Sequence, residues 1–262
     1  MQVATASRTS PQIPFGSARS ARAILQDMNK PAAASCANCA LTKICMPFEV
    51  DDDAAELFQR LVSTRVRLRK GDVLFRAGDR FTALFSIRLG SIKTVTLTDD
   101  GSEQVSGYHL PGEVIGVEGI GNDVHACQAL ALEDSEVCML PFDRIEKLAH
   151  EDASFQRHLY RLLSSAIVHE RAVTLMLGTM RAEQRLASFL LDLSSRYRLR
   201  GYSSTEFVLR MTREEIGSHL GLKLETVSRL FSRFAEEGLI AVNGRLVKLL
   251  DRIALQHLVT AS

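Results

Sequence analysis

The stretch TREEIGSHLGLKLETVSRLFSRF, residues 212–234, decides how the C-terminal part of the chain folds. Its first four residues have the Thr-x-x-Glu form of a helix capping box, so a short helix is expected to begin after Thr212. Gly221 then supplies a tight turn. A second helix follows, because apolar residues recur at i, i+3, i+4 and i+7 from Val227 onward and define one buried face. This pattern is typical of a helix-turn-helix.

The outward face of the second helix carries side chains that suit base recognition. Arginine can bind guanine with two hydrogen bonds, glutamate can accept a hydrogen bond from cytosine, and serine can bind a base edge or a phosphate. The residues concerned are Glu225, Ser228 and Arg229. An ordinary helical hairpin with a solvated polar face would show the same pattern. The segment nevertheless favours a recognition helix that binds double-stranded DNA.

The residues after the second helix predict a wing. Two short apolar runs flank the turn residues Asn243-Gly244, which is the pattern of a small hairpin, and Arg245 lies at its tip. A basic wing gives the domain a contact to phosphates. Residues 181–262 also hold 13 Lys and Arg against 9 Asp and Glu, so this part of the chain is basic. We therefore predict a winged helix-turn-helix over residues 182–262.

Upstream, residues 65–140 show the period of two that indicates half-buried strands. Val66 and Leu68 alternate with arginines, and glycine turns recur every 7 to 12 residues, with Asp100-Gly101 as a good hairpin turn. No helical pattern separates these strands. The pattern favours an antiparallel barrel or sandwich and argues against a parallel nucleotide-binding sheet.

Between these two parts a long helix is predicted, beginning near Asp152. Apolar residues recur in steps of four and three, the spacing of a coiled-coil seam, with Glu170 in the middle. Across a two-fold axis Glu170 would face its own copy, and the like charges would oppose pairing. We interpret the seam as a weak, switchable dimer contact, although a helix packed only on its own domain is the simpler alternative. The expected dimer residues are Leu159, Leu163, Ala166, Ile167, Glu170, Val173 and Leu177.

The N-terminal part contains an unusual group of thiols. Cys36, Cys39 and Cys45 fall within ten residues, and the other two cysteines, Cys127 and Cys138, lie far along the chain. The odd number and the clustering favour a metal site in a reducing compartment over a disulfide framework. Three thiolates need a fourth ligand, and the residues leave open whether zinc or an iron-sulfur cluster is held.

Composition excludes several other classes of protein. The chain has 262 residues, 46% of them hydrophobic, with no apolar run near the roughly 18 residues that cross a bilayer. The seven histidines have no metal spacing and none pairs with a nucleophile in a known signature, so an enzyme is not expected. We predict a cytoplasmic protein with a disordered tail over residues 1–30.

These motifs together resemble the FNR regulators of the CRP/FNR superfamily, which are oxygen-sensing bacterial transcription factors. The resemblance rests on Cys-x2-Cys-x5-Cys from Cys36, on EVCMLPF at 136–142 and on ETVSR at 225–229. It implies an α+β protein: an antiparallel β-roll of the cyclic-nucleotide-binding type within a sensor domain over residues 31–150, a dimerisation helix over 151–181 and the winged helix-turn-helix.

The resemblance also implies how the parts work. A 4Fe-4S cluster would bind Cys36, Cys39, Cys45 and Cys138, with Cys127 as a structural thiol. The cluster would promote a homodimer on palindromic TTGAT-type sites, oxygen as the signal would destroy it, and RNA polymerase would be a partner. Glu225, Ser228 and Arg229 would bind DNA.

The cyclic-nucleotide branch of the superfamily is the remaining alternative. Gly112-Glu113 and Gly116 keep part of the nucleotide loop, but residues 122–128 lack the Arg-Ser pair that would neutralise the cyclic phosphate. An unpaired buried phosphate would be costly. We therefore expect a relic pocket that is packed with side chains.

Overall fold

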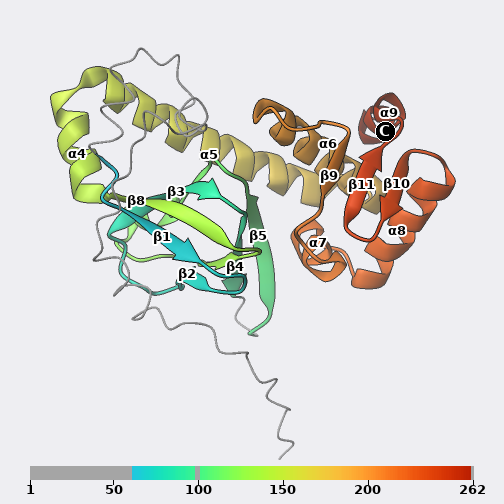
Figure 1. The fold of residues 1–262 in the computed structure, drawn as a ribbon, viewed down its shortest axis with the longest axis horizontal. Coiled ribbons are helices and arrows are strands. Elements are labelled where there is room, and N and C mark those ends of the chain that lie inside the picture. The colour runs from blue at the N-terminus through green and yellow to red at the C-terminus, as the bar shows by residue number, and fades with distance from the viewer. Residues whose placement is uncertain (1–60, 98–100, 261–262) are drawn as a thin grey trace, which may run out of the picture.

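The computed structural model describes residues 61–97 and 101–260 (Figure 1). Eight strands form the β-roll. They are β1 Thr64–Leu68, β2 Val73–Phe75, β3 Ala83–Leu89, β4 Ile92–Leu97, β5 Glu103–His109, β6 Val114–Ile115, β7 Gln128–Ala131 and β8 Ser135–Pro141. The predicted tail and the three clustered cysteines lie outside the described residues.

The strands form two four-stranded sheets in which every described pair is antiparallel, as the alternating pattern predicted. Their orders are β1-β8-β3-β6 and β2-β7-β4-β5. Apolar side chains from both sheets, among them Val66, Ile87 and Ile92, fill the interior. The interior of the β-roll is therefore an apolar core.

One turn of the β-roll requires glycine. Gly90 has a φ of +80°, and a Cβ placed there would lie 2.2 Å from the Ser135 hydroxyl. A side chain would clash as well as strain the backbone. The turn joins β3 to β4, which belong to different sheets, so Gly90 helps to close the roll.

Two helices follow the β-roll, where the periodicity had indicated only one. Helix α4, Phe142–Glu151, packs Ile145 and Leu148 on the sheet that contains β8. Helix α5, Ala153–Thr179, begins where the Asp152 carboxylate accepts hydrogen bonds from the backbone N–H groups of Ser154 and Phe155. This N-cap ends one helix and starts the next. In Figure 1, α5 runs from the β-roll to the C-terminal domain.

The C-terminal domain has the predicted winged helix-turn-helix. Thr212 and Glu215 form the capping box through reciprocal hydrogen bonds of 3.1 and 2.7 Å. The hairpin pairs with a third strand that the sequence pattern did not reveal, giving the order β10-β11-β9. The elements are α6 Ala182–Leu199, β9 Glu206–Val208, α7 Arg213–Leu220, α8 Leu224–Glu236, β10 Ile240–Asn243, β11 Leu246–Leu249 and α9 Arg252–Thr260.

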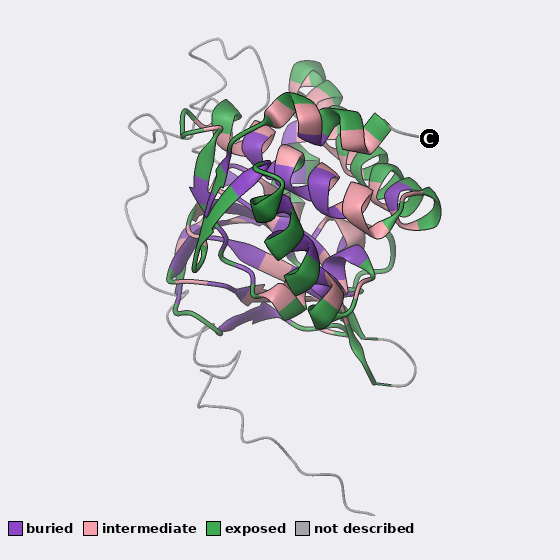
Figure 2. Ribbon diagram, turned by 90° about the vertical axis from the view of Figure 1, so that its right-hand side faces the viewer, coloured by how far each residue is buried: buried purple, intermediate pink, exposed green. Residues whose placement is uncertain are grey.

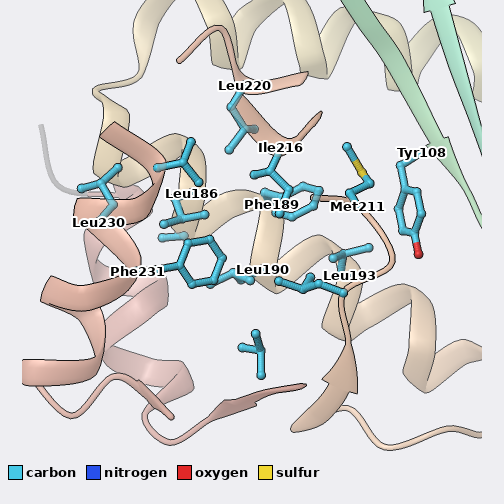
Figure 3. Packing of buried hydrophobic residues seen from close by; sticks show 14 of the residues in the cluster. Tyr108, Leu186, Phe189, Leu190, Leu193, Met211, Ile216, Leu220, Leu230 and Phe231 are labelled. Atoms are coloured by element: carbon cyan, nitrogen blue, oxygen red, sulfur yellow. The ribbon is translucent and has the colours of Figure 1, made fainter. Parts of the chain in front are cut away.

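The core of the C-terminal domain continues into the β-roll. Tyr108 and Leu110 of the β-roll belong to the same apolar cluster as Leu193 and Met211 (Figure 3). Figure 2 looks onto the C-terminal domain and shows buried residues on the inner sides of its helices and exposed residues outside. The two domains therefore share a continuous buried contact.

Candidate nucleic-acid interface

Helix α8 presents the two faces that its sequence predicts. Val227, Leu230, Phe231 and Phe234 are buried, with Val227 and Phe234 fully inaccessible. Glu225, Ser228 and Arg229 are all exposed on the opposite side. In the part of the chain that the structure describes, neither Glu225 nor Arg229 forms an ion pair. The face is available to a partner with hydrogen-bonding edges.

Helix α7 supports α8 through a close approach at the turn. A Cβ on Gly217 would lie 2.6 Å from the Leu222 carbonyl oxygen, and Gly221 has a φ of +62°. Arg213 stacks on Phe231 with its guanidinium 3.4 Å from the ring centroid. The angle between the two helices is thus fixed by tight packing at the turn and by an aromatic contact.

Arg185 of α6 joins the long helix to the helix-turn-helix. Its guanidinium donates hydrogen bonds to the carbonyls of Leu177 at 2.7 Å, Met180 at 2.9 Å and Leu220 at 3.0 Å. These carbonyls end α5 and α7, so one side chain caps both helices. Sequence reasoning missed Arg185, because a single arginine on a helix carries no signal of distant carbonyl partners.

The wing has the tight turn that Asn243-Gly244 predicted. Gly244 has a φ of +59°, and Arg245 follows it on the exposed tip. Within the described chain the guanidinium of Arg245 makes one hydrogen bond, to the Arg210 carbonyl, which is 3.4 Å long. Its charge therefore remains available to a phosphate.

Cys138 lies on the outer face of the sheet, among cations. It is opposite Arg65 of β1 and Ser86 of β3 in the strand register, so the three side chains share one face. The thiol is buried, and Arg65 is largely so, with a buried Nε that has no hydrogen-bond partner. The same face carries Glu136, two residues before Cys138, which pairs with Arg65 and Arg88. Cys36, Cys39 and Cys45 are outside the described residues, so the set of four ligands stays a prediction.

Cys127 has the opposite environment. Its thiol donates a hydrogen bond of 3.5 Å to Glu118 of the 3-10 helix η1, Val117–Gly121, and His125 contacts the same carboxylate at 3.0 Å. Burial, and then the Glu118 charge, raise the pKa of the Cys127 thiol to about 12. A protonated thiol beside a carboxylate is a poor metal ligand. Within the described ranges, no group of three His, Cys, Asp or Glu residues could hold a metal ion.

The predicted dimer seam is only partly free in the single chain. Leu159 packs on the cluster beneath α4, and Val173 and Leu177 pack on the core of the C-terminal domain. Ile167, at 56% exposure, and Glu170 face solvent in the middle of the helix. No partner chain is present, so the dimer seam stays a prediction. Its two ends already have partners in the chain, and Leu163 and Ala166 between them are half-buried.

The segment that would face a cyclic phosphate offers no cation. His125 is 3% exposed and stacks on Phe75 with ring centroids 3.8 Å apart. Glu113 of the nucleotide loop is instead bound by Arg196 of α6 and by Arg200, the C-cap residue of that helix. Sequence reasoning missed both partners, because they lie more than 80 residues away in the chain.

None of the helices in the described residues is both long enough and apolar enough to span a membrane.

Two family models match the chain. A cyclic nucleotide-binding domain matches residues 65–152, and a Crp-like helix-turn-helix domain matches residues 184–258. The first covers the β-roll with α4, and the second covers almost all of the C-terminal domain.

Curated relatives match over nearly the whole chain. The transcriptional regulatory protein btr of Bordetella pertussis is 46% identical over 87% of this chain and 95% of its own length. The transcriptional activator protein anr of Pseudomonas aeruginosa is 40% identical, over 85% of this chain and 91% of its own. The fumarate and nitrate reduction regulatory protein of Escherichia coli is 38% identical, over 86% and 90%.

Solved structures have the same fold. FixK2 from Bradyrhizobium japonicum superposes with a TM-score of 0.70 at 30% identity, over 76% of this chain and 98% of that one. A CRP/FNR family transcriptional regulator from Thermus thermophilus, TTHA1359, superposes with a TM-score of 0.60 at 22% identity, over 75% and 98%.

Proposed function

The chain belongs to the CRP/FNR family of transcription regulators, and from that premise we propose that it is an oxygen-responsive member that uses a 4Fe-4S cluster. It is a DNA-binding regulator and not an enzyme. The single observation that best supports the finer proposal is the place of Cys138, a buried thiol on a cation-bearing sheet face. Relatives with names such as anaerobic regulatory protein support the oxygen response.

Four thiolates would hold the cluster: Cys36, Cys39, Cys45 and Cys138. When bound, a 4Fe-4S cluster supplies an oxygen-labile centre with a negative charge from its four thiolates. Arg65 and Arg88 provide positive charge on the face where Cys138 lies, and they share Glu136 as a counter-ion. These residues would stabilise the Cys138 thiolate and hold it at a fixed position on β8.

The middle of α5 would form the dimer contact. Ile167 is exposed, Leu163 and Ala166 flank it, and Tyr160, Val168 and Leu175 add exposed apolar surface along the same helix. Glu170 would face its copy across the two-fold axis, so the charges oppose pairing. A cluster-dependent contribution of a few kcal/mol would then decide between monomer and dimer.

The dimer would bring two α8 helices to successive turns of duplex DNA. Glu225, Ser228 and Arg229 would recognise palindromic TTGAT-type sites, and Arg245 would bind phosphate. RNA polymerase would be a partner at the promoter, and the cytoplasm would be the compartment, because an oxygen-labile cluster and free thiols need reducing conditions.

Two matched variants test the cluster. We expect the Cys138→Ser variant, reconstituted without oxygen, to lose iron and sulfide and the visible absorption of the cluster. Cys127→Ser should keep all three. Iron and sulfide counts with visible spectra, recorded before and after exposure to air, measure the difference. Equal cluster content in the two variants would contradict the ligand assignment.

Replacing Glu170 tests the dimer contact. The Glu170→Ala variant should dimerise and bind a TTGAT palindrome in air, since the opposing charge is removed. Sedimentation gives the oligomeric state, and a gel-shift assay gives the DNA affinity. A variant that stays monomeric would contradict the proposed role of this residue.

The alternative is a zinc-stabilised or cyclic-nucleotide-binding regulator without a redox cluster. The match of residues 65–152 to a cyclic nucleotide-binding domain favours the second form. The engagement of Glu113 by Arg196 and Arg200, and the burial of His125, argue against it. A zinc protein would be colourless and unaffected by oxygen, and a nucleotide-binding protein would respond to cyclic AMP in calorimetry.

A further inference from the structure

We propose that Glu113 is a positioning residue for DNA binding, because it fixes helix α6, and with it the recognition helix α8, against the β-roll. The proposal does not depend on oxygen sensing or on a cluster. It assigns to Glu113 a partner within the chain in place of a nucleotide.

The contacts at Glu113 form a closed network between the two domains. Arg196 donates to the Glu113 carboxylate at 3.0 and 2.7 Å, and Arg200 donates to it at 2.6 Å. The same guanidinium groups donate to two carbonyls of the β-roll, Tyr108 at 2.5 Å and Pro111 at 2.6 Å. The loop's own backbone N–H at Leu110 completes the shell of the carboxylate at 3.2 Å. Two side chains of α6 are thus held by five hydrogen bonds to one short stretch of the β-roll.

The arginine side chains of the network are shielded from solvent, so water does not replace a partner that is lost. The side chain of Arg200 is 4% exposed and that of Arg196 is 15% exposed. Burial alone would raise the pKa of Glu113, but the Arg196 charge, followed by His109 and Arg200, outweighs it and holds the pKa below its ordinary value. The carboxylate is therefore charged at neutral pH. Guanidinium groups cannot lose their protons. In the described chain Glu113 is the carboxylate that pairs with Arg200, whereas Arg196 also pairs with Asp192 at 3.1 Å.

The second contact between the domains lies at α7 and also consists of an ion pair and hydrogen bonds. Lys93 of β4 forms an ion pair of 2.7 Å with Glu215, and the Ser218 hydroxyl accepts a hydrogen bond of 2.8 Å from the Val105 backbone. Apolar side chains of β4 and β5 fill the space between the contacts. Apolar packing is not directional, whereas ion pairs and hydrogen bonds fix direction. The network at Glu113 therefore sets the angle at which α6 meets the β-roll.

The position of α8 follows from that angle. The core of the C-terminal domain joins α6, α7 and α8 in one cluster, so the domain moves as a unit. A helix-turn-helix dimer must present its two helices about 34 Å apart on DNA. A small rotation at α6 would displace α8 and spoil this match.

Distance measurements in the full chain test the proposal. Spin labels are placed on genetically encoded ketone residues at Ala77 in the β-roll and at Glu236 in α8, two exposed positions outside the network. Pulsed electron resonance of the aerobic protein then gives the distance between the domains. We expect one narrow distribution in the parent chain. Glu113→Gln should broaden it or add a second population, and Glu113→Asp, which keeps the charge, should restore most of the narrow one.

A matched control separates positioning from general loss of stability. Asp72 is 4% exposed, and its carboxylate accepts a hydrogen bond from Arg69 within the β-roll. Asp72→Asn should lower the melting temperature and leave the distance distribution unchanged. An unchanged distribution in Glu113→Gln, or equal broadening in Asp72→Asn, would overturn the proposal. If Glu113→Gln fails to fold, Arg200→Lys replaces it in the test, because lysine keeps the charge but loses the paired geometry. An unchanged distance distribution in Arg200→Lys would then overturn the proposal.

Discussion

Two carboxylates of the β-roll are each surrounded by arginines, but the arginines come from different places. Glu136 on β8 is paired with Arg65, Arg67 and Arg88, which all lie on neighbouring strands of its own sheet. Glu113 is paired with Arg196 and Arg200, which belong to the C-terminal domain. The first network ties strands that backbone hydrogen bonds already join. The second ties two domains, which also meet through apolar contact and through the ion pairs Lys93–Glu215 and Arg210–Glu133.

The difference lies also in exposure. One partner of Glu136, the Arg67 side chain, is 88% exposed, whereas both partners of Glu113 are mostly buried. Removing the partner of a solvent-exposed charge costs little stability, because water solvates the charge. Removing the partner of a buried charge costs much more. A Glu–Arg ion pair can therefore contribute little to stability on a sheet surface and much more at a contact between domains.

Removing the carboxylate at Glu113 should have the largest effect. We expect Glu113→Ala to lower the free energy of unfolding by about 3 to 5 kcal/mol, because the buried guanidinium group of Arg200 loses its counter-ion and that of Arg196 keeps only Asp192. Denaturant unfolding measures the loss. The m value, which is the dependence of the free energy on denaturant concentration, is compared between the two proteins. A decrease below about 1 kcal/mol would place Glu113 with the surface pairs and break the comparison.

Acid should weaken the domain contact through His109, which lies 3.8 Å from Glu113. Burial lowers the pKa of His109 from 6.5 to about 4, against the attraction of Glu113. The unfolded chain therefore takes up this proton at a higher pH than the folded chain. The contribution of His109 to stability is complete above pH 6.5 and is lost as the pH falls from 6.5 to about 4, by about 3 kcal/mol at most.

The comparison of the parent chain with His109→Gln over this pH range reports that contribution, since the two proteins differ only at this residue. We expect the stability difference between the two proteins to change between pH 6.5 and 4 and to be flat above pH 7. A difference that is constant across the range would refute the assignment.

The smallest effect should come from the exposed member of the Glu136 network. Arg67→Ala should change the free energy of unfolding by no more than about 0.5 kcal/mol, as is usual for a solvated ion pair. Arg88→Ala, which removes a partner at 2.8 Å with 29% exposure, should cost more. If the two variants are equally mild, the Glu136 network contributes little to stability, which sharpens its contrast with Glu113.

Local patterns were sufficient for the elements that present the DNA-binding face. The faces of α8, the capping box at Thr212, the turn at Gly221 and the tip of the wing all agree with the sequence analysis. Each depends on residues a few positions apart, and helical periodicity reports them directly. The start of the long helix near Asp152 was predicted, but helix α4 before it was missed, because its ten residues carry only a short apolar pattern.

The sequence by itself determined which residues turn inward or outward along each element. Only the tertiary structure decided what the inward residues meet. In the tertiary structure, Leu159 and Val173 pack on different cores. Arg185 donates hydrogen bonds to three carbonyls, and Arg196 pairs with Glu113. The physical reason is that burial along a helix or strand follows from local spacing, whereas a partner 83 residues away is chosen by the docking of whole domains.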